Sequence, residues 1–519
     1  MMAVQPPPVM PPGSAATVVR KSTLVSGLSL MAGFAGMLSQ MVLAHAFGTS
    51  LQIGAYFAVT SVTGILIGLA PVVYAGSILP TLMRLNGNPL ERVRVTSAAL
   101  VWTLLLGCGV GLAGGGFSPQ IVGLLMPGLQ EPLLSVSVQV SRLLWVTVAV
   151  SLLVSVLTTV HHSKRRFLRV AGISLLPPVS VALFVFATSR VLGIRSIAAG
   201  LLAAGLVQVV VLLPGGLCDI KLRRMDLFHA EVLQIVRRIL PVALSLLPFT
   251  MAPFIVIYWV LRIEPAAVPF FGYSQSFATV LSVAVGYGIA VVTFPDLAAS
   301  SDAADGGAFV ARVETYLRFV FLAAVAIGLF VGVFRGPLLK LLLERGAFNE
   351  ASVRGTAGVL PWYAVAAVCV ACLNLLRNTY YARKDYRTVA AMGLLITLVL
   401  VLLAGGLGHW FSHEGVAAAY ACSFALHLFL ALVWMRSGSA RLLSWSLISY
   451  MARVLVVLGI SASAAACVHK GLGPNVPLWA GAAAGALVTF ALAVTLGLTL
   501  IPIREIQRLS AFVAARFVP

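Results

Sequence analysis

The chain is dominated by apolar runs, each about as long as a membrane-spanning helix and separated by short polar turns. A helix needs about 20 apolar residues to cross a bilayer. The runs are continuous and lack the alternation of a membrane β-barrel strand, the other structure that pairs its backbone in lipid. The pattern predicts an all-α polytopic membrane protein with fourteen spans, near residues 23–47, 52–82, 95–115, 134–160, 170–189, 196–216, 238–261, 266–294, 315–334, 355–376, 388–408, 415–435, 446–468 and 477–501.

The first of these runs has some features of a secretory signal peptide. Arg20 and Lys21 precede it, and Ala44-His45-Ala46 is similar to a cleavage site. The apolar core of a signal peptide is about 7–15 residues long, whereas residues 23–47 contain no Asp, Glu, Lys or Arg at all. We therefore expect a first helix that stays in the mature protein.

The basic residues fall mostly in alternate turns. If the N-terminus is cytoplasmic, most of the 35 Lys and Arg residues lie on the cytoplasmic side, including the clusters at 20–21, 164–169, 221–224 and 383–387. Such a bias fixes the orientation of a membrane protein by the positive-inside rule. It predicts an even number of spans with both termini in the cytoplasm.

The order of spans divides the chain into two halves joined by a basic segment. Two six-helix bundles with a site between them near the midplane are typical of transporters built from repeats. The expected organisation is a disordered Pro-rich cytoplasmic tail (1–22), an N-terminal six-helix lobe (23–217), a cytoplasmic basic connector (218–236), a C-terminal six-helix lobe (237–436), and helices 13 and 14 with a cytoplasmic tail (437–519).

Composition excludes several other classes of protein. The chain has 519 residues, of which 60% are hydrophobic and 10% charged, against about 25% charged in a soluble domain. The net charge of +20 is a topology signal and not a nucleic-acid surface, because the cations lie in turns between spans. Of the six cysteines, Cys369 and Cys372 form a CxxC without a nearby His or acid, so no metal or redox site is expected. No nucleotide loop or catalytic set is recognisable, so we expect no enzyme activity and no cofactor.

Two stretches around the tenth span resemble the MurJ/MviN family of the MOP flippase superfamily. LLLERGAFNEASV (341–353) is similar to the family's "ERGAFD" loop, and LRNTYYARKDYRT (376–388) is similar to its "FYAxxDTxTP" segment. The matching positions are Glu344, Arg345, Gly346, Ala347, Phe348, Tyr381, Ala382, Asp385 and Thr388. The resemblance implies a multi-pass protein of the bacterial inner membrane that flips an undecaprenyl-diphosphate-linked glycan to the outer leaflet. Lipid II, the peptidoglycan precursor, is the best-known cargo, and relatives carry exopolysaccharide or oligosaccharide units.

The chain departs from this family at the charged positions. Ser29, Gly33 and Phe34 match the first-helix motif "SRxxGFxRD". Neutral residues replace the family's charges at Leu30, Gly36, Met37, Gly54, Ile67, Gly68, Ser274 and Gln275. Acids and bases are lost together, as expected because an unpaired charge in the membrane is expensive. The chain is thus similar to a divergent member that lacks the usual cationic site, so its cargo is lipid II or another lipid-linked glycan.

Few residues remain that could hold such a cargo. Arg142 lies about eight residues into the fourth span and is either a cavity cation for the diphosphate or an interfacial residue. Gln40, His45 and Gln275 can bond sugar hydroxyls or make helix-helix contacts. Arg262 is either a substrate cation or the partner of Glu264 in a surface ion pair.

Two other functions stay open at this point. A non-transporting scaffold for envelope-synthesis enzymes would keep the loops but lose the cavity charges. A cation-coupled drug antiporter of the same superfamily would need a carboxylate in mid-membrane, and all fifteen acids lie at span ends or in loops. The expected partners are the undecaprenyl-linked lipid, membrane lipids, and glycosyltransferases or polymerases of the same pathway. The sequence does not identify a coupling ion.

Overall fold

The structure is a computed structural model, and it describes residues 12–216, 226–227, 229–282, 306–382, 385–437 and 445–471. Within these residues the chain is helical and forms no strand. Apart from two short 3-10 turns, the helices are α1 (Pro12–Phe47), α2 (Leu51–Arg84), α3 (Pro89–Gly116), α4 (Ser118–Leu125), α5 (Leu133–Ser163), α6 (Phe167–Ile173), α7 (Leu176–Leu192), α8 (Arg195–Gly216), α9 (Ala230–Ile263), α10 (Val268–Ser282), α12 (Gly306–Val333), α13 (Arg335–Leu343), α14 (Glu350–Ala382), α15 (Tyr386–Ser437) and α16 (Trp445–Gly471).

Eleven helical segments in this part of the chain are long and apolar enough to cross a membrane. The prediction of an all-α polytopic membrane protein is confirmed. The segment within α15 includes two predicted spans, 388–408 and 415–435, because the backbone leaves the helical conformation at Phe411 and Ser412. The fourteenth predicted span and the C-terminal tail lie outside the described residues, as does the second half of the eighth span.

Two boundaries differ from the sequence-based expectation. Helix α1 begins at Pro12, so residues 12–22, expected in a disordered tail, are helical. Proline is favoured in the first turn of a helix, where its missing N–H costs nothing. Helix α9 begins at Ala230 after the His229 cap, so residues 230–236 of the expected connector are also helical. Residues 1–11, 217–225 and 228 lie outside the described part of the chain.

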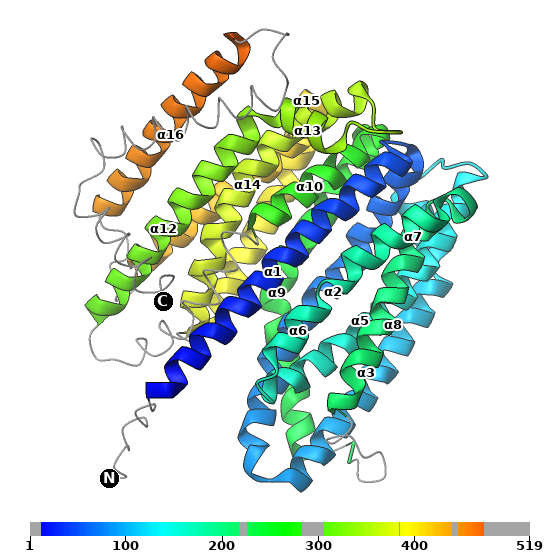
Figure 1. The fold of residues 1–519 in the computed structure, drawn as a ribbon, viewed down its shortest axis with the longest axis vertical. Helices are drawn as coiled ribbons and strands as arrows, with labels where there is room; N and C mark the ends of the chain where they lie inside the picture. The colour runs from blue at the N-terminus through cyan, green and yellow to red at the C-terminus, as the bar shows by residue number, and fades with distance from the viewer. Residues whose placement is uncertain are drawn as a thin grey trace.

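The helices form two groups on either side of α1 (Figure 1). Helices α3, α5, α7 and α8 lie on one side, and α12, α13 and α14 lie on the other. We call α1–α8 the first lobe and α9–α16 the second lobe. Helix α9 joins the two, because Val232 and Ile235 pack into a core cluster with α2, α3 and α5, while Val256 and Val260 pack into the core of the second lobe.

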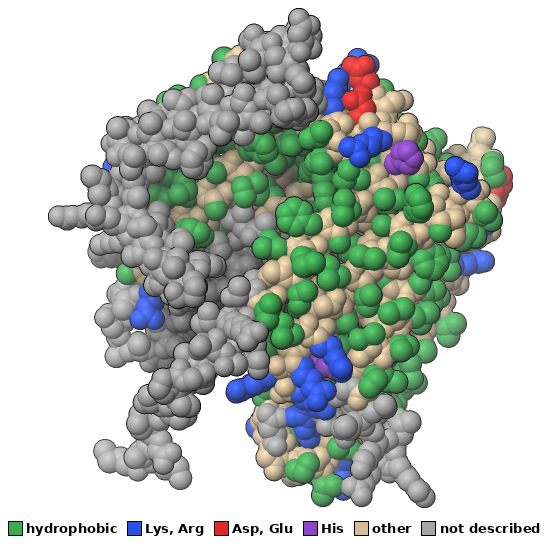
Figure 2. Space-filling model, in the orientation of Figure 1, with side chains coloured by type: hydrophobic (Ala, Val, Ile, Leu, Met, Phe, Trp, Pro, Cys, Tyr) green, Lys and Arg blue, Asp and Glu red, His purple; other side chains and the backbone are tan. Residues whose placement is uncertain are grey.

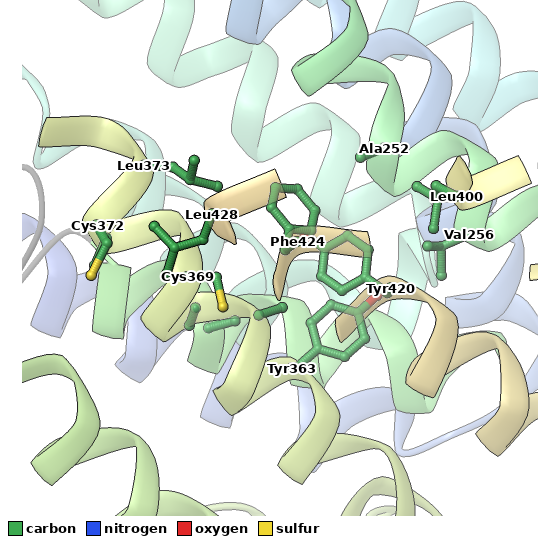
Figure 3. Packing of buried hydrophobic residues seen from close by; sticks show 14 of the residues in the cluster. Ala252, Val256, Tyr363, Cys369, Cys372, Leu373, Leu400, Tyr420, Phe424 and Leu428 are labelled. Atoms are coloured by element: carbon green, nitrogen blue, oxygen red, sulfur yellow. The ribbon is translucent and has the colours of Figure 1, made fainter. Parts of the chain in front are cut away.

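The core of the second lobe is built around stacked aromatic rings (Figure 3). Tyr363 of α14 stacks on Tyr420 of α15 with ring centroids 4.8 Å apart, and Tyr420 contacts Phe424 at 4.9 Å. Cys369 and Cys372 lie in the same cluster as buried free thiols. This packing fixes α14 against α15 and so positions the second-lobe wall of the site described next.

We call the end of the bundle that holds the predicted cytoplasmic turns the inner end, and the opposite end the outer end. Helix α1 reaches the outer end at Phe47, and α2 returns from it at Leu51. Helices α10 and α14 also begin at the outer end, because α9 and α12 run outward before them (Figure 1).

Candidate functional site

A cavity of about 420 Å³ lies between the two lobes. One wall comes from α2 of the first lobe and the others from α9, α10, α14 and α15 of the second. Its apolar lining includes Leu69, Val72, Leu246, Phe249, Pro253, Val370, Leu373, Tyr420 and Phe424, and its polar lining includes Thr250, Gln275, Asn374, Arg377 and Asn378. Pockets of this size with an apolar lining and a few convergent polar groups are typical of ligand sites.

The polar wall of the cavity is one face of α14. Asn374, Arg377 and Asn378 are spaced i, i+3 and i+4, which places them on the same side of a helix. Arg377 donates a hydrogen bond to the Asn374 side chain, and its guanidinium carbon lies 4.8 Å from the centroid of the Phe249 ring. These contacts hold a half-buried guanidinium at the cavity, where its planar fork suits phosphate oxygens.

Gln275 supplies a hydrogen-bonding amide on the α10 side of the cavity. Its Nε2 donates to the Thr279 hydroxyl at 3.3 Å, whereas its buried Oε1 has no partner among the described residues. The Ser274 hydroxyl beside it is also buried without a partner there. Gly68, a second position where the family resemblance expects charge, lines the same cavity. Two positions at which the chain lacks the family's charges, Gly68 and Gln275, therefore border the same cavity as Arg377.

The outer end of the bundle is closed by contacts between α1 and the loop joining α13 to α14. The Ala347 backbone N–H donates to the His45 carbonyl at 2.9 Å, and the buried Tyr273 hydroxyl donates to the Gly48 carbonyl at 2.8 Å. The hydroxyls of Thr49 and Ser352 lie 2.8 Å apart. We call these contacts, between 45–49 of the first lobe and Tyr273 with 344–352 of the second, the outer closure.

Two glycines allow the backbones to meet in the outer closure. Gly48 and Gly346 have φ of +55° and +59°, in the left-handed region that favours glycine. A Cβ on Gly48 would lie 2.2 Å from the Ala347 carbonyl oxygen, and one on Gly346 would lie 2.5 Å from the His45 carbonyl oxygen. Neither position has space for a side chain while the closure is formed.

Aromatic rings fill the space beneath this backbone contact. Tyr273 meets Phe348 edge to face with centroids 5.3 Å apart, and it meets Phe57 of α2 in the same way at 5.5 Å. Phe348 and Tyr273 are fully buried. Gln275 follows Tyr273 by two residues on α10, which begins at the outer end, so the aromatic layer lies nearer to that end than the α10 wall of the cavity.

The predicted substrate-binding residues lie in different places. Gln275 lines the cavity, and His45 belongs to the outer closure. Gln40 lies in α1 with a buried Oε1 that has no partner among the described residues. Arg142 is exposed on α5 and is not a lining residue of this cavity. Their roles in binding stay predictions.

The expected surface pair of Arg262 with Glu264 is wrong for the structure described here. The Arg262 guanidinium carbon instead lies 3.7 Å from the centroid of the Tyr258 ring. The Glu264 carboxylate accepts hydrogen bonds from the Ser412 hydroxyl at 2.9 Å and the His413 ring at 2.6 Å. Partial burial would raise the pKa of Glu264, but these two partners and the His413 charge lower it overall. Glu264 thus finds its partners in the turn within α15 and not in Arg262 at the end of α9.

Several positions that match family motifs make structural contacts in this fold, and others make none. Asp385 caps α15 by accepting from the Thr388 N–H at 3.1 Å. Arg345 donates to the Leu341 carbonyl at 3.0 Å, and Gly346 and Phe348 belong to the outer closure.

The first-helix motif makes fewer contacts. Ser29 donates to the Val25 carbonyl at 3.0 Å, and Phe34 is exposed on α1. Nothing lies within 4 Å of a Cβ built on Gly33. Tyr381 ends α14.

Sequence reasoning missed the cation that lines the cavity. From the sequence, Arg377 belongs with the cytoplasmic charges that follow the tenth span, because Arg383 and Lys384 come a few residues later. The spacing of Asn374, Arg377 and Asn378 could have indicated a polar helix face, since a helix brings these positions together. That spacing does not reveal which helix the face meets.

Comparisons with known proteins agree with this architecture. The family "Lipid II flippase MurJ" matches residues 43–475. The lipid II flippase MurJ of Burkholderia cenocepacia is 23% identical over 431 residues, which cover 79% of this chain and 82% of that protein. The probable lipid II flippase MurJ of Thermotoga maritima is 22% identical over 441 residues, which cover 84% of this chain and 90% of that protein.

Solved structures share the fold. A lipid II flippase MurJ in an inward closed conformation superposes with a TM-score of 0.76 at 13% identity, covering 92% of this chain and 100% of that one. An inward-facing multidrug resistance MATE transporter of the MOP superfamily superposes with a TM-score of 0.69 at 14% identity, covering 81% of this chain and 98% of that one. Because the family match extends over most of the length, from the end of α1 to the end of α16, the chain belongs to the lipid II flippase MurJ family.

Proposed function

We propose that this protein moves an undecaprenyl-diphosphate-linked glycan from the inner to the outer leaflet of the bacterial inner membrane, without chemical change to the cargo. The observation that carries the proposal is the cavity between the lobes, with Arg377 and three side-chain amides on its walls. A guanidinium suits a diphosphate. Amides suit sugar hydroxyls, and the apolar lining tolerates the first part of a lipid tail.

Alternating access follows from the same arrangement. Contacts between the lobes close the outer end, so the cavity is separated from the outer side by the aromatic layer at Tyr273 and Phe348. Release of cargo to the outer leaflet requires these contacts to break. The outer closure is suited to such a switch. The hydrogen bond from Ala347 to His45 can break and re-form, and Gly48 and Gly346 let the two backbones approach each other.

A cation-coupled drug antiporter is the weaker reading. Such a protein holds its coupling ion or cationic drug with an intramembrane carboxylate, and the residues that line the described cavity include no Asp or Glu. A pure scaffold has no need of a half-buried arginine held at a cavity between lobes. Both observations favour transport of an anionic lipid-linked cargo.

Complementation identifies the cargo. The chain is expressed in bacteria depleted of their own lipid II flippase, and growth is compared with that of cells holding an empty vector. Rescue assigns lipid II as a cargo. Failure to rescue, together with loss of a secreted polysaccharide when the native gene is deleted, assigns another lipid-linked glycan. Retention of both lipid II transport and polysaccharide export in the deletion strain contradicts the proposed transport.

A disulfide across the outer closure is expected to block transport. The Thr49 and Ser352 hydroxyl oxygens are 2.8 Å apart, so cysteines at both positions place their sulfur atoms close enough for an S–S bond of about 2.05 Å. In a background without the six native cysteines, oxidation of Thr49→Cys/Ser352→Cys should stop transport, and a reductant should restore it. Mass spectrometry checks the bond, and a flipping assay in proteoliposomes checks the transport.

A matched pair within one lobe provides the control. The Ser118 and Ser141 hydroxyl oxygens lie 3.0 Å apart, on α4 and α5 of the first lobe. Ser118→Cys/Ser141→Cys should transport equally fast in its oxidised and reduced forms, because its disulfide does not join the lobes. Equal inhibition by both disulfides would show that the outer closure has no special role.

A further inference from the structure

A strongly basic turn lies at the inner end of the first lobe, away from the cavity. It joins α5 to α6 and contains Lys164, Arg165, Arg166 and Arg169 within six residues. The three arginines are exposed. Figure 2 shows Lys and Arg side chains gathered in this region of the molecule, near the place of α6 in Figure 1.

The three arginines of this turn have no carboxylate partner among the described residues. Residues 132–218 contain no Asp or Glu. In the described part of the chain, no ion pair involves Arg165, Arg166 or Arg169. The arginines therefore present several guanidinium donors on one exposed turn, where each can bond two oxygens of a phosphate group.

The backbone at Arg165 favours a different residue. Helix α5 ends in a Schellman motif, in which the Arg166 N–H donates to the His161 carbonyl at 3.0 Å and the Arg165 N–H donates to the His162 carbonyl at 2.9 Å. The motif puts Arg165 at φ +55°, a position that is usually glycine because a Cβ is strained there. The fold thus carries a cation at a position where glycine would be more stable.

Apolar side chains accompany the cations. Phe167 and Leu168 are 46% and 37% exposed, and the ring of Phe167 contacts that of His162 with centroids 5.5 Å apart. The turn joins two candidate membrane spans, Leu133–Ser163 and Phe167–Leu192, so it sits where both spans end. Exposed apolar groups beside arginines are suited to the boundary between acyl chains and headgroups.

We infer that the α5–α6 turn, residues 164–169, is a binding site for the phosphate groups of anionic phospholipids in the inner leaflet. The turn contributes no residue to the inter-lobe cavity, which favours bulk phospholipid over the diphosphate of the cargo. Basic segments beside a membrane attract anionic lipids in proportion to their charge. This site is additional to the proposed transport path and does not depend on which glycan is carried.

Lipid binding to the purified full-length chain tests the site, with phosphatidylglycerol as the probe and phosphatidylcholine as the neutral reference. Native mass spectrometry gives the affinity. Arg166→Gln/Arg169→Gln should weaken phosphatidylglycerol binding roughly fivefold for each arginine and leave phosphatidylcholine unchanged. The control Arg237→Gln/Arg238→Gln removes two exposed cations from the same end of the molecule, on α9, and should change binding less than twofold.

Arg165→Gly separates binding from a structural role. It removes a charge and relieves the strained backbone, so the unfolding temperature should rise while phosphatidylglycerol affinity falls roughly fivefold. Unchanged affinity in this variant, or equal losses in the 166/169 and 237/238 pairs, would overturn the site. Displacement of phosphatidylglycerol by equimolar undecaprenyl diphosphate, lost in the 166/169 pair, would overturn bulk phospholipid as the ligand and assign the cargo diphosphate instead.

Discussion

Replacing Gly48 by alanine is expected to open the outer closure. The left-handed backbone costs a Cβ about 1 kcal/mol. The added methyl group would also lie 2.2 Å from the Ala347 carbonyl oxygen, so the two backbones must separate. Separation breaks the hydrogen bonds from Ala347 to His45 and from Tyr273 to Gly48, at about 1 kcal/mol each. The sum, about 3 kcal/mol, shifts the equilibrium roughly 100-fold toward an open outer end.

Cysteine labelling measures this shift. Ser352 is 2% exposed, so Ser352→Cys in a cysteine-free background should react slowly with an impermeant maleimide added outside. Addition of Gly48→Ala should increase the labelling rate by up to that factor. Gly193→Ala is the control, because Gly193 has φ +56° but nothing within 4 Å of its Cβ. A rate unchanged by Gly48→Ala would mean that these contacts do not limit access from outside.

The membrane spans could be predicted from sequence because their cause is local. A run such as residues 134–160 must bury its backbone hydrogen bonds in lipid whatever surrounds it, and helix α5 (Leu133–Ser163) follows it closely. The break between the eleventh and twelfth spans was also predictable, since Gly405, Gly406 and the polar residues after Phe411 interrupt the apolar pattern. The start of α1 was missed because a proline-rich segment gives little indication of where helix begins.

The outer closure was not predictable, because its cause is not local. Gly48 and Gly346 lie almost three hundred residues apart, and each alone is consistent with an ordinary helix end or turn. The resemblance singled out Gly346 and Phe348 as motif residues without saying what they touch. In the structure they meet α1 and Tyr273, which explains why the loop needs a glycine followed closely by an aromatic ring.

The loss of charge from α1, α2 and α10 has a counterpart in α14. Gly68 of α2 and Gln275 of α10 stand at the cavity where the family resemblance expects charged residues, while Arg377 reaches the same cavity from α14. The Arg377 guanidinium is held there by its contact with the Phe249 ring and its hydrogen bond to Asn374. In the proposed function, this guanidinium is the group on the cavity wall best suited to contact the diphosphate of the cargo.

Replacing Arg377 by alanine is therefore expected to abolish most transport. Removal of a desolvated cation from its anionic partner costs about 2–5 kcal/mol, which corresponds to a loss of roughly 30-fold or more in cargo affinity. Lysine at this position keeps the charge but not the planar fork, so Arg377→Lys should retain partial activity. A flipping assay in proteoliposomes measures both variants, with thermal unfolding as the check that α14 still packs.

Arg142→Ala is the matched control, because it removes an arginine from an exposed face of α5 outside the cavity lining. It should transport at close to the wild-type rate. The opposite order, with Arg142→Ala inactive and Arg377→Ala active, would place the cargo's diphosphate on the first lobe and contradict the site described here. Arg142 is a candidate because of its depth in the fourth predicted span, and Arg377 because of its place at the interface between the lobes. The two variants therefore show which of these positions governs the binding of an anionic cargo.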